Sequence, residues 1–569
     1  MRGDSRAGDS VVNTVHFRFN TTAVRIVSAL VVFWLQAAAL QYASGTWSSE
    51  FGGEPDEPAH YVTALMVQAF LLSGSYADPL AFASDYYLHY PKVALGHWPP
   101  LQYGLLGLWL TLFGATRVAA LAFIALVAAA SATTLYLVAR DKIGPIAGWL
   151  AGTLFLALPL VQTSSGMVML ESLVTLLTLL STLAFARFVS SRRISDALGF
   201  SFLAVAAILT RGSAWSLGLL PPLALLLSRR LDLLRSPALW LSVLPVAFLC
   251  VPWYVATQGM TKGAFVSDSF DPDFTLAALP QFTRFVASSL GFALSIPFAI
   301  GLWVKVLRPL IHAGEPVDPV WAALAAIIVV TILFHSLVPA AIVPRYMVPV
   351  MPAAVLFSIA GADALAHRLS QSSEHLSLTR PITFVLMLAA FGVESFHIPA
   401  LTNGGYRASL AAVAPAEGQG TQVVLISSGP LGEGSLVDTA AEAAAKAGED
   451  QFLVVRGSKM LVDQDWLMRN WTSRVSTTEE IHAMLERIPI DVVIIDDIWH
   501  ELQQRPYHTL LREALESEPA KWKKLATYPI QYRGKLFPEA LQIYVSARNP
   551  QRPRQHSIDT DFIRSFTGH

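Results

Sequence analysis

The feature that most constrains this chain is a series of apolar runs that recur between residues 23 and 399. Each run is about 17–22 residues long, which is enough for a helix to cross the ~30 Å hydrocarbon layer of a bilayer. Composition agrees, because charged residues make up only 14% of the chain against roughly 25% in soluble domains. The sequence therefore predicts a mostly α-helical, polytopic membrane protein.

We predict about eleven transmembrane helices, and basic residues follow alternate ones. Examples are Arg140 and Lys142 after the second helix and Arg192 and Arg193 after the fourth. Because Lys and Arg concentrate in cytoplasmic loops, these loops are assigned to the cytoplasm. The predicted spans are 23–43, 117–139, 144–163, 172–189, 196–213, 214–228, 237–257, 284–304, 319–338, 345–362 and 381–399.

The alternation of basic loops holds only if the apolar segment 99–114 does not cross the membrane. That segment is short and begins with two prolines, so we expect a helix lying in the outer interface. The first outer loop is then 44–116, residues 1–22 form a cytoplasmic tail, and the C-terminal region lies outside the cell. The expected location is the inner (plasma) membrane.

The C-terminal region has a different composition from the membrane part at 23–400. Between 415 and 548, short apolar strands at 421–428, 451–455 and 491–497 alternate with amphipathic helices at 436–447, 478–488 and 507–517. This alternation predicts a small extracytoplasmic α/β domain. Its loops lack the glycine pattern and the lysine of a phosphate-binding loop, which argues against a nucleotide site. Residues 549–569 are expected to be a loosely ordered tail.

Net charge and cysteine content constrain function little. The formal charge is -1, and it hides the asymmetry between basic inner loops and acidic outer loops. Cys250, the only cysteine, lies within an apolar run, so no intrachain disulfide is possible and the redox compartment stays open.

Two adjacent carboxylates, Asp56 and Glu57, directly follow the first predicted span in the stretch FGGEPDEPAHY. Acidic residues ahead of a proline suit a helix N-terminus, so helix capping is the simpler interpretation. Their position on the outer face suggests a second interpretation, in which one of them takes part in proton transfer. A carboxylate at the membrane surface can accept a proton from a reacting group.

Two arginines lie on the side where the orientation rule does not need them. Arg211, in LTRG, is near the outer end of the fifth predicted span, and Arg345, in PRYMVPVMP, begins the tenth. A charge near the membrane favours an anionic partner. A guanidinium binds phosphate in a fork, so a phosphate or pyrophosphate ligand is one candidate. Pairing with a distant carboxylate such as Glu171, at an outer loop boundary, is the other.

The first outer loop also carries His60 and His97 among several aromatic residues. Histidines beside carboxylates could bind a divalent metal, although no spacing here is diagnostic, and the metal content is left unknown. The aromatic side chains could anchor the loop in the interface or stack on sugar rings. The sequence does not separate these two roles.

Several short motifs together resemble the GT-C superfamily of polytopic glycosyltransferases. The resemblance is to the branch of glycosyltransferase family 39 type that contains the protein O-mannosyltransferases and the lipid A aminoarabinose transferases. It spans about residues 20–400 and is carried, in order, by DEPAHY, PPLQY, RDK, MLES, LTRG and PRYMVPVMP. Three positions depart from the pattern. Glu171 stands where an aspartate is usual, Arg211 stands where a lysine is usual, and HWPP lacks the acidic-lysine pair of the aminoarabinose enzymes.

The resemblance implies an activity. Such enzymes transfer a sugar, with inversion, from a polyprenyl-phosphate donor to a lipid, protein or polysaccharide acceptor on the outer (periplasmic) face. Asp56 would be the general base and Glu57 would orient the acceptor or assist. Arg211 and Arg345 would hold the donor phosphate, with Glu171, His60, His97 and Tyr346 as possible further contacts to substrate or metal. No nucleic-acid partner and no certain cofactor is implied.

Two other classes of function remain open. A transporter or flippase of lipid-linked sugars would use the same arginines without a base, but transporters usually place polar groups at the membrane midplane. An inactive GT-C scaffold whose outer domain binds a partner is the third possibility. The sequence does not name the sugar, the prenyl chain or the acceptor.

Overall fold

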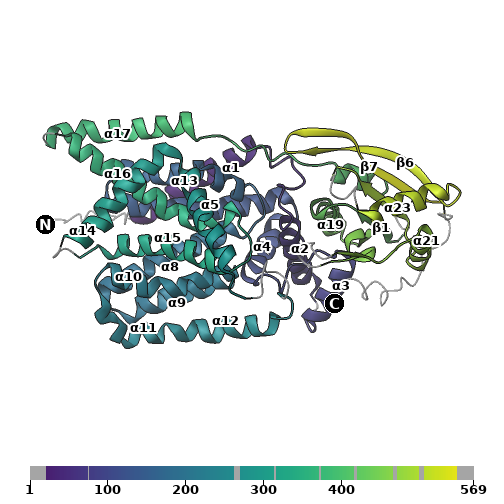
Figure 1. The fold of residues 1–569 in the computed structure, drawn as a ribbon, viewed down its shortest axis with the longest axis horizontal. Helices are drawn as coiled ribbons and strands as arrows, with labels where there is room; N and C mark the ends of the chain where they lie inside the picture. Colours follow the sequence, from purple (N-terminus) through teal and green to yellow (C-terminus); the bar gives the residue numbers. More distant parts are fainter. Residues whose placement is uncertain are drawn as a thin grey trace, which may run out of the picture.

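The computed structural model describes residues 21–74, 76–261, 269–312, 316–370, 373–415, 420–464, 471–498 and 505–547. The predicted C-terminal tail at 549–569 lies outside the described residues. So does the predicted N-terminal tail, except for its last two residues. The structure has a helical membrane part and a C-terminal α/β domain, as the sequence predicts (Figure 1).

The membrane part consists almost entirely of helices. In chain order its α-helices and short 3₁₀ or π segments (η) are α1 (Thr21–Ala43), α2 (Glu57–Ser73), α3 (Pro79–His89), α4 (Leu101–Phe113), α5 (Arg117–Lys142), α6 (Pro145–Ala157), α7 (Pro159–Ser165), α8 (Glu171–Ser191), α9 (Ile194–Ile208), η1 (Gly212–Leu219), α10 (Leu220–Leu227), η2 (Leu231–Arg235), α11 (Pro237–Leu241), α12 (Val243–Thr257), α13 (Pro272–Leu302), η3 (Trp303–Leu307), α14 (Arg308–Ile311), α15 (Pro319–Leu337), η4 (Pro344–Val350), α16 (Met351–Leu369), α17 (Ser373–Glu394) and α18 (Tyr406–Ala411).

Eight helical stretches among the described residues are long and apolar enough to span a membrane. The number becomes nine if α6 and α7, which bend by 65° at Leu158, form one span. The prediction of eleven spans is not confirmed. The difference lies mainly at 196–213 and 214–228, where the structure has the shorter helices α9, η1 and α10.

The break between α9 and η1 has a local cause. The chain leaves the helix after Ile208, and Arg211 has an extended backbone, with φ -155 and ψ 134. This geometry ends the helix before its charged side chain would face hydrocarbon. Segment 99–114 is likewise short, because α4 has 13 residues. It packs against α2, where a Cβ on Gly107 would meet the side chain of Val67.

The C-terminal domain is built on a five-stranded sheet. Its strands are β1 (Gln422–Ser427), β2 (Phe452–Arg456), β5 (Val492–Asp496), β6 (Trp522–Tyr532) and β7 (Lys535–Ser546), and its helices are α19 (Pro430–Ala447), α20 (Gly457–Met460), α21 (Thr478–Arg487) and α23 (Pro506–Ser517). Strands β3 (Val462–Asp463) and β4 (Thr472–Ser473) form a separate small pair.

The sheet order is β2-β1-β5-β7-β6, with β2, β1 and β5 parallel and the last two strands antiparallel. The three parallel strands and helices α19, α21 and α23 confirm the predicted α/β pattern. The long β6–β7 hairpin was not predicted. In Figure 1 it extends from the sheet toward the membrane part.

The two parts meet at the first outer loop. Helices α2, α3 and α4 lie between the bundle and the α/β domain (Figure 1). Helix α19 packs directly against α2, where a Cβ on Gly434 would lie 3.0 Å from Pro58. The α/β domain therefore rests on the segment that carries Asp56 and Glu57.

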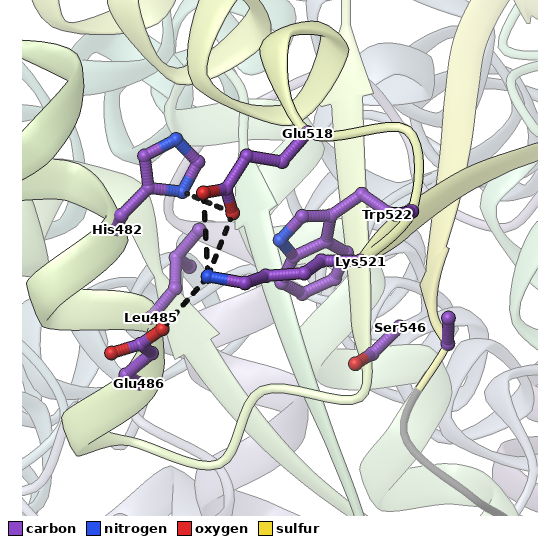
Figure 2. Close-up of a pocket in the computed structure, with 9 residues that line it drawn as sticks. His482, Leu485, Glu486, Glu518, Lys521, Trp522 and Ser546 are labelled. Carbon is purple, nitrogen blue, oxygen red and sulfur yellow. Dashed lines mark hydrogen bonds and ion pairs between the residues drawn. The ribbon is translucent and has the colours of Figure 1, made fainter.

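Figure 2 shows a cavity of about 180 Å³ in the α/β domain. It lies between α21 and the beginning of β6, and its lining includes His482, Glu486, Glu518 and Lys521. Lys521 bridges Glu486 and Glu518 at 3.1 Å from each. The cavity is lined by α/β-domain residues alone, so it is separate from the carboxylate and arginine cluster described next.

Candidate functional site

Asp56 is the residue immediately before α2, but its side chain does not cap the helix. It makes no capping hydrogen bond to the first turn of α2. Its Oδ2 instead accepts a hydrogen bond of 2.7 Å from Arg345 Nη2. The side chain keeps 24% of its surface exposed. The local geometry therefore does not support the simple capping interpretation, and it leaves a carboxylate beside a cation at the end of the helical bundle.

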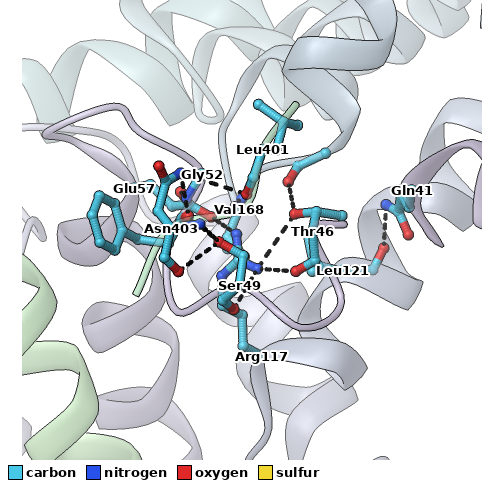
Figure 3. Close-up of polar contacts among 12 residues, drawn as sticks. Gln41, Thr46, Ser49, Gly52, Glu57, Arg117, Leu121, Val168, Leu401 and Asn403 are labelled. Carbon is cyan, nitrogen blue, oxygen red and sulfur yellow. Dashed lines mark hydrogen bonds and ion pairs between the residues drawn. The ribbon is translucent and has the colours of Figure 1, made fainter. Parts of the chain in front are cut away.

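The neighbouring carboxylate, Glu57, points elsewhere and is 1% exposed. It pairs with Arg117 Nη2 at 2.6 Å and accepts hydrogen bonds from the backbone N–H of Val168 (3.0 Å) and of Gly52. Arg117 in turn donates to the carbonyl oxygens of Thr46 (2.6 Å) and Ser49 (3.2 Å). Figure 3 shows how this pair fastens the first outer loop to α5 and to the segment before α8.

Arg345, in η4, lies at the centre of three carboxylates. Besides Asp56, it has Glu54 Oε2 at 3.3 Å from Nη1 and Glu171 Oε1 at 3.8 Å from Nε. Its Nε and Nη1 are buried yet have no hydrogen-bond partner among the described residues. The guanidinium thus keeps unused donors while it is held in place electrostatically.

Arg211 pairs with Glu171, the first residue of α8, which is 1% exposed. The carboxylate pairing that the sequence left open for Arg211 is therefore present in the structure. The guanidinium carbon of Arg211 lies 4.7 Å from the centre of the Tyr346 ring, and Tyr346 stacks on His335 with ring centres 4.6 Å apart. Glu171 joins the two arginines into one cluster.

The two predicted histidines occupy different surroundings. His60, on α2, is buried and its Nδ1 lies 2.8 Å from the Tyr103 hydroxyl. Burial lowers the pKa of His60 to about 4, so it is neutral at physiological pH. His97 is half-buried with its ring 6.1 Å from that of Trp98. Among the described residues, no three His, Cys, Asp or Glu side chains are close enough to hold a metal ion.

The ionisation states of the loop carboxylates follow from the same contacts. Burial favours the neutral form of Asp56, but the Arg345 guanidinium outweighs it and holds the pKa of Asp56 below its ordinary value. For Glu54, burial dominates and raises the pKa despite Arg345. Asp56 is therefore the carboxylate that is ionised, partly exposed and next to a cation.

Sequence reasoning found Asp56, Glu171, Arg211 and Arg345, and the structure brings these four together. It did not find Arg117, whose partners lie sixty or more residues away in the chain. It also missed Asn403, which is 1% exposed. Asn403 joins the first outer loop to the linker ahead of the α/β domain, since its Nδ2 donates to Phe51 O at 2.9 Å. No local motif marks either residue.

Comparisons with known proteins bear on the family and on the fold. Residues 97–255 match the family model described as dolichyl-phosphate-mannose-protein mannosyltransferase. That range contains Arg117, Glu171 and Arg211 and excludes Asp56 and Arg345. None of the curated proteins compared with the chain matches it.

One of the solved structures similar to this chain shares its overall fold with a TM-score above 0.5. The crystal structure of ArnT from Cupriavidus metallidurans bound to undecaprenyl phosphate has a TM-score of 0.52 at 14% identity, covering 94% of this chain and 99% of that one. Its apo form gives a TM-score of 0.49 at 14% identity, covering 92% and 97%. The archaeal oligosaccharyltransferase AglB from Archaeoglobus fulgidus, in complex with an inhibitory peptide and a dolichol-phosphate, gives 0.49 at 12% identity, covering 93% and 75%.

Proposed function

We propose that this chain, a membrane glycosyltransferase of the GT-C superfamily, transfers a sugar from a polyprenyl-phosphate donor to an acceptor hydroxyl on the outer face of the plasma membrane. Asp56 acts as the general base. Arg345, assisted by Arg211, binds the donor phosphate. The sugar passes to the acceptor with inversion, and the prenyl phosphate leaves.

The observation that carries this proposal is the state of Arg345. It holds Asp56 with one nitrogen and keeps two buried nitrogens without hydrogen-bond partners in the described structure. These two nitrogens face Glu54 at 3.3 Å and Glu171 at 3.8 Å without forming hydrogen bonds, so a phosphate that takes the place of Glu54 would gain a charge-assisted fork. The same contact would stabilise the negative charge that the phosphate gains as the sugar leaves.

Donor binding also explains how a paired carboxylate becomes a base. An aspartate next to an unshared arginine is a weak proton acceptor, because the cation stabilises the ionised form. When the singly charged phosphodiester of the donor shares Arg345, that stabilisation falls while the burial of Asp56 remains. The pKa of Asp56 then rises, so the base becomes effective only once the donor is in place.

Arg211 and Glu171 hold the opposite side of the same cluster. Glu171 is nearly fully buried and contacts both arginines, so it fixes their spacing without itself reaching solvent. The Tyr346 ring lies between Arg211 and His335. This arrangement gives the donor phosphate a rigid wall, which lowers the reorganisation needed for transfer.

The test is Asp56→Asn in purified protein reconstituted in lipid nanodiscs. Asparagine keeps the size and polarity of the side chain but does not accept the proton, so we expect sugar transfer to fall about 10²-fold or more. Binding of undecaprenyl phosphate should persist. Asp85→Asn, an exposed carboxylate on the same outer loop, is the matched control and should transfer normally.

Mass spectrometry of lipid that co-purifies with the protein identifies the donor directly. A polyprenyl-phosphate sugar in the wild type and in Asp56→Asn supports the proposal. If Asp56→Asn transferred sugar at the wild-type rate, Asp56 would not be the general base. A protein that moves lipid-linked sugar between leaflets without any transfer would instead support the transporter.

A further inference from the structure

The tip of the β6–β7 hairpin reaches from the α/β domain to the loop that carries Asp56. Strand pairing continues to Tyr532 and Lys535, which leaves a two-residue turn of Arg533 and Gly534. Both turn residues have positive φ, 49° and 77°. Such a turn suits the twist of a hairpin, but it favours Asn or Gly at its first position. A long charged side chain therefore occupies a position where it carries a backbone cost.

The tip is fastened at a fixed place. The Arg533 N–H donates to Asn403 Oδ1 at 2.6 Å, and the Gly534 N–H donates to Thr402 O at 3.2 Å. Asn403 also donates to Phe51 O in the first outer loop. One buried amide therefore ties the turn of the α/β domain to Phe51, six residues before Glu57 in the first outer loop.

The fastening places the Arg533 side chain beside Gly53. A Cβ built on Gly53 would lie 3.8 Å from Arg533 Nε and 3.9 Å from the Tyr532 ring. Gly53 has φ +107° and precedes Glu54. The Arg533 side chain thus lies beside Gly53, which is three residues before Asp56 in the chain.

Arg533 is exposed, and its guanidinium makes no ion pair or hydrogen bond with any described residue. Its guanidinium carbon lies 5.4 Å from the centre of the Tyr532 ring. Its charge also acts on Glu54, where it opposes the rise in pKa, although Glu54 pairs directly with Arg345. Lys535, two residues on, is exposed as well. The turn therefore presents positive charge and an aromatic face to the aqueous side of the site.

We propose that Arg533 and Tyr532 bind the acceptor, and that the acceptor carries a phosphate or carboxylate close to the hydroxyl that receives the sugar. This inference rests on the proposed function. The donor arrives from the membrane toward Arg345, so the acceptor approaches from the aqueous side. There the guanidinium fork meets its anionic group and the tyrosine ring meets its apolar or sugar face. Specificity for the acceptor then lies in the α/β domain.

The simpler alternative is that Arg533 only offsets the charge of Glu54. The two interpretations predict different kinetic effects of replacing Arg533. A residue that binds the acceptor changes its KM, whereas a residue that tunes Glu54 acts through Arg345 and Asp56 and lowers kcat. Conservative replacement also separates them, because lysine retains the charge but loses the fork.

The experiment uses the full-length protein in nanodiscs and a membrane extract from cells that lack the gene. Anion exchange divides the extract into anionic and neutral acceptor fractions, and purified donor lipid is supplied equally to both. Mass spectrometry detects the added sugar. Phosphatase treatment and carboxyl methylation of the anionic fraction then distinguish a phosphate from a carboxylate acceptor.

We expect transfer into the anionic fraction only. In Arg533→Ala the KM for that fraction should rise roughly tenfold with kcat within about twofold, and Arg533→Lys should be intermediate. Lys523→Ala, an exposed cation of the same hairpin far from its tip, is the control and should match the wild type. Binding of undecaprenyl phosphate should be equal in all four proteins.

Transfer into the neutral fraction, or an unchanged KM in Arg533→Ala, would overturn the proposal. A decrease in kcat alone would show that Arg533 acts on Glu54 and does not bind the acceptor. These outcomes leave the proposed function intact as long as Asp56→Asn abolishes transfer in the same assay. Full activity of Asp56→Asn would contradict both the proposed function and the proposed role of Arg533.

Discussion

At the scale of single residues, the adjacent carboxylates Asp56 and Glu57 have opposite surroundings. Asp56 is partly exposed and meets Arg345, whereas Glu57 is buried against Arg117 and two backbone N–H groups. Adjacent residues at the start of a helix point in different directions, so one can meet a substrate while the other holds the loop. We infer that Glu57 positions Asp56 and does not itself meet the acceptor.

Replacement of either partner of the Glu57–Arg117 pair should destabilise the protein before it affects chemistry. Removing one member leaves a buried charge without its counter-charge, which costs about 3–5 kcal/mol. Arg117→Met should therefore lower the thermal unfolding temperature in detergent, followed by intrinsic fluorescence. Glu57→Gln should do the same to a smaller extent, since an amide still accepts from Val168. If Glu57→Gln unfolded like the wild type but lost 10²-fold in kcat, Glu57 would belong to the chemistry.

The pH profile of transfer should report the Asp56–Arg345 contact. Because Arg345 holds the pKa of Asp56 below its ordinary value in the protein without donor, the base of the free enzyme stays ionised and the wild-type kcat/KM should be level from about pH 5 to 8. Arg345→Ala removes the cation and leaves the burial, which raises the pKa. The acid limb of kcat/KM should then move to higher pH, with the residual rate recovering as pH increases. An unmoved acid limb would show that Asp56 titrates independently of Arg345.

A residue of the candidate site could be predicted only where its position in the sequence is itself unusual. Arg211 and Arg345 were marked by lying on the side opposite to the basic loops, and Asp56 by its place after the first span. Arg117 was only the first residue of the predicted span 117–139 and was given no role, because its partners at 46, 49 and 57 come together only in three dimensions. Its function is a product of tertiary contact, which no single-sequence pattern records.

At the scale of elements, the helices and strands that could be predicted were again those with a recognisable pattern in the local sequence. The three parallel strands of the α/β domain were predicted because apolar runs alternate there with amphipathic helices. The β6–β7 hairpin was missed, although the turn Arg533-Gly534 lies between two stretches rich in aromatic and β-branched residues. The predicted spans 196–213 and 214–228 read as continuous apolar helices, because hydropathy does not show that the chain unwinds to present Arg211.

Close packing between α13 and α16 should depend on one glycine. A Cβ on Gly361 would lie 1.8 Å from Pro297 O, so alanine there must push two helices apart. We expect Gly361→Ala to lose about 1–3 kcal/mol of stability or more, seen as a lower unfolding temperature and faster inactivation in detergent. Gly199→Ala, on α9 with nothing within 4 Å of its Cβ, is the control and should be neutral or slightly stabilising. Equal behaviour of the two variants would show that α13 and α16 are not in close contact.

At the scale of the whole molecule, residues from distant parts of the chain converge at one end of the helical bundle. They come from the loop before α2, the start of α8, the break after α9, and η4, and the α/β domain rests on the same end (Figure 1). Asn403, in the linker, binds both the first outer loop and the hairpin tip. A site assembled at the junction of two parts can respond to a lipid from one side and to an aqueous acceptor from the other.

This arrangement makes the orientation of the chain its most consequential property. The basic residues that alternate between helices predict that Arg193 lies inside and that the α/β domain lies outside, on the same face as Asp56. The test begins with Cys250→Ala, which removes the only native cysteine. Single cysteines then replace the exposed residues Glu513, in α23, and Arg193, between α8 and α9. A membrane-impermeant maleimide should label position 513 in intact cells, whereas position 193 should react only after permeabilisation. The reverse pattern would put Asp56 and Arg345 on the cytoplasmic side, where soluble nucleotide sugars are available, and the case for a lipid-linked donor would lose its physical basis.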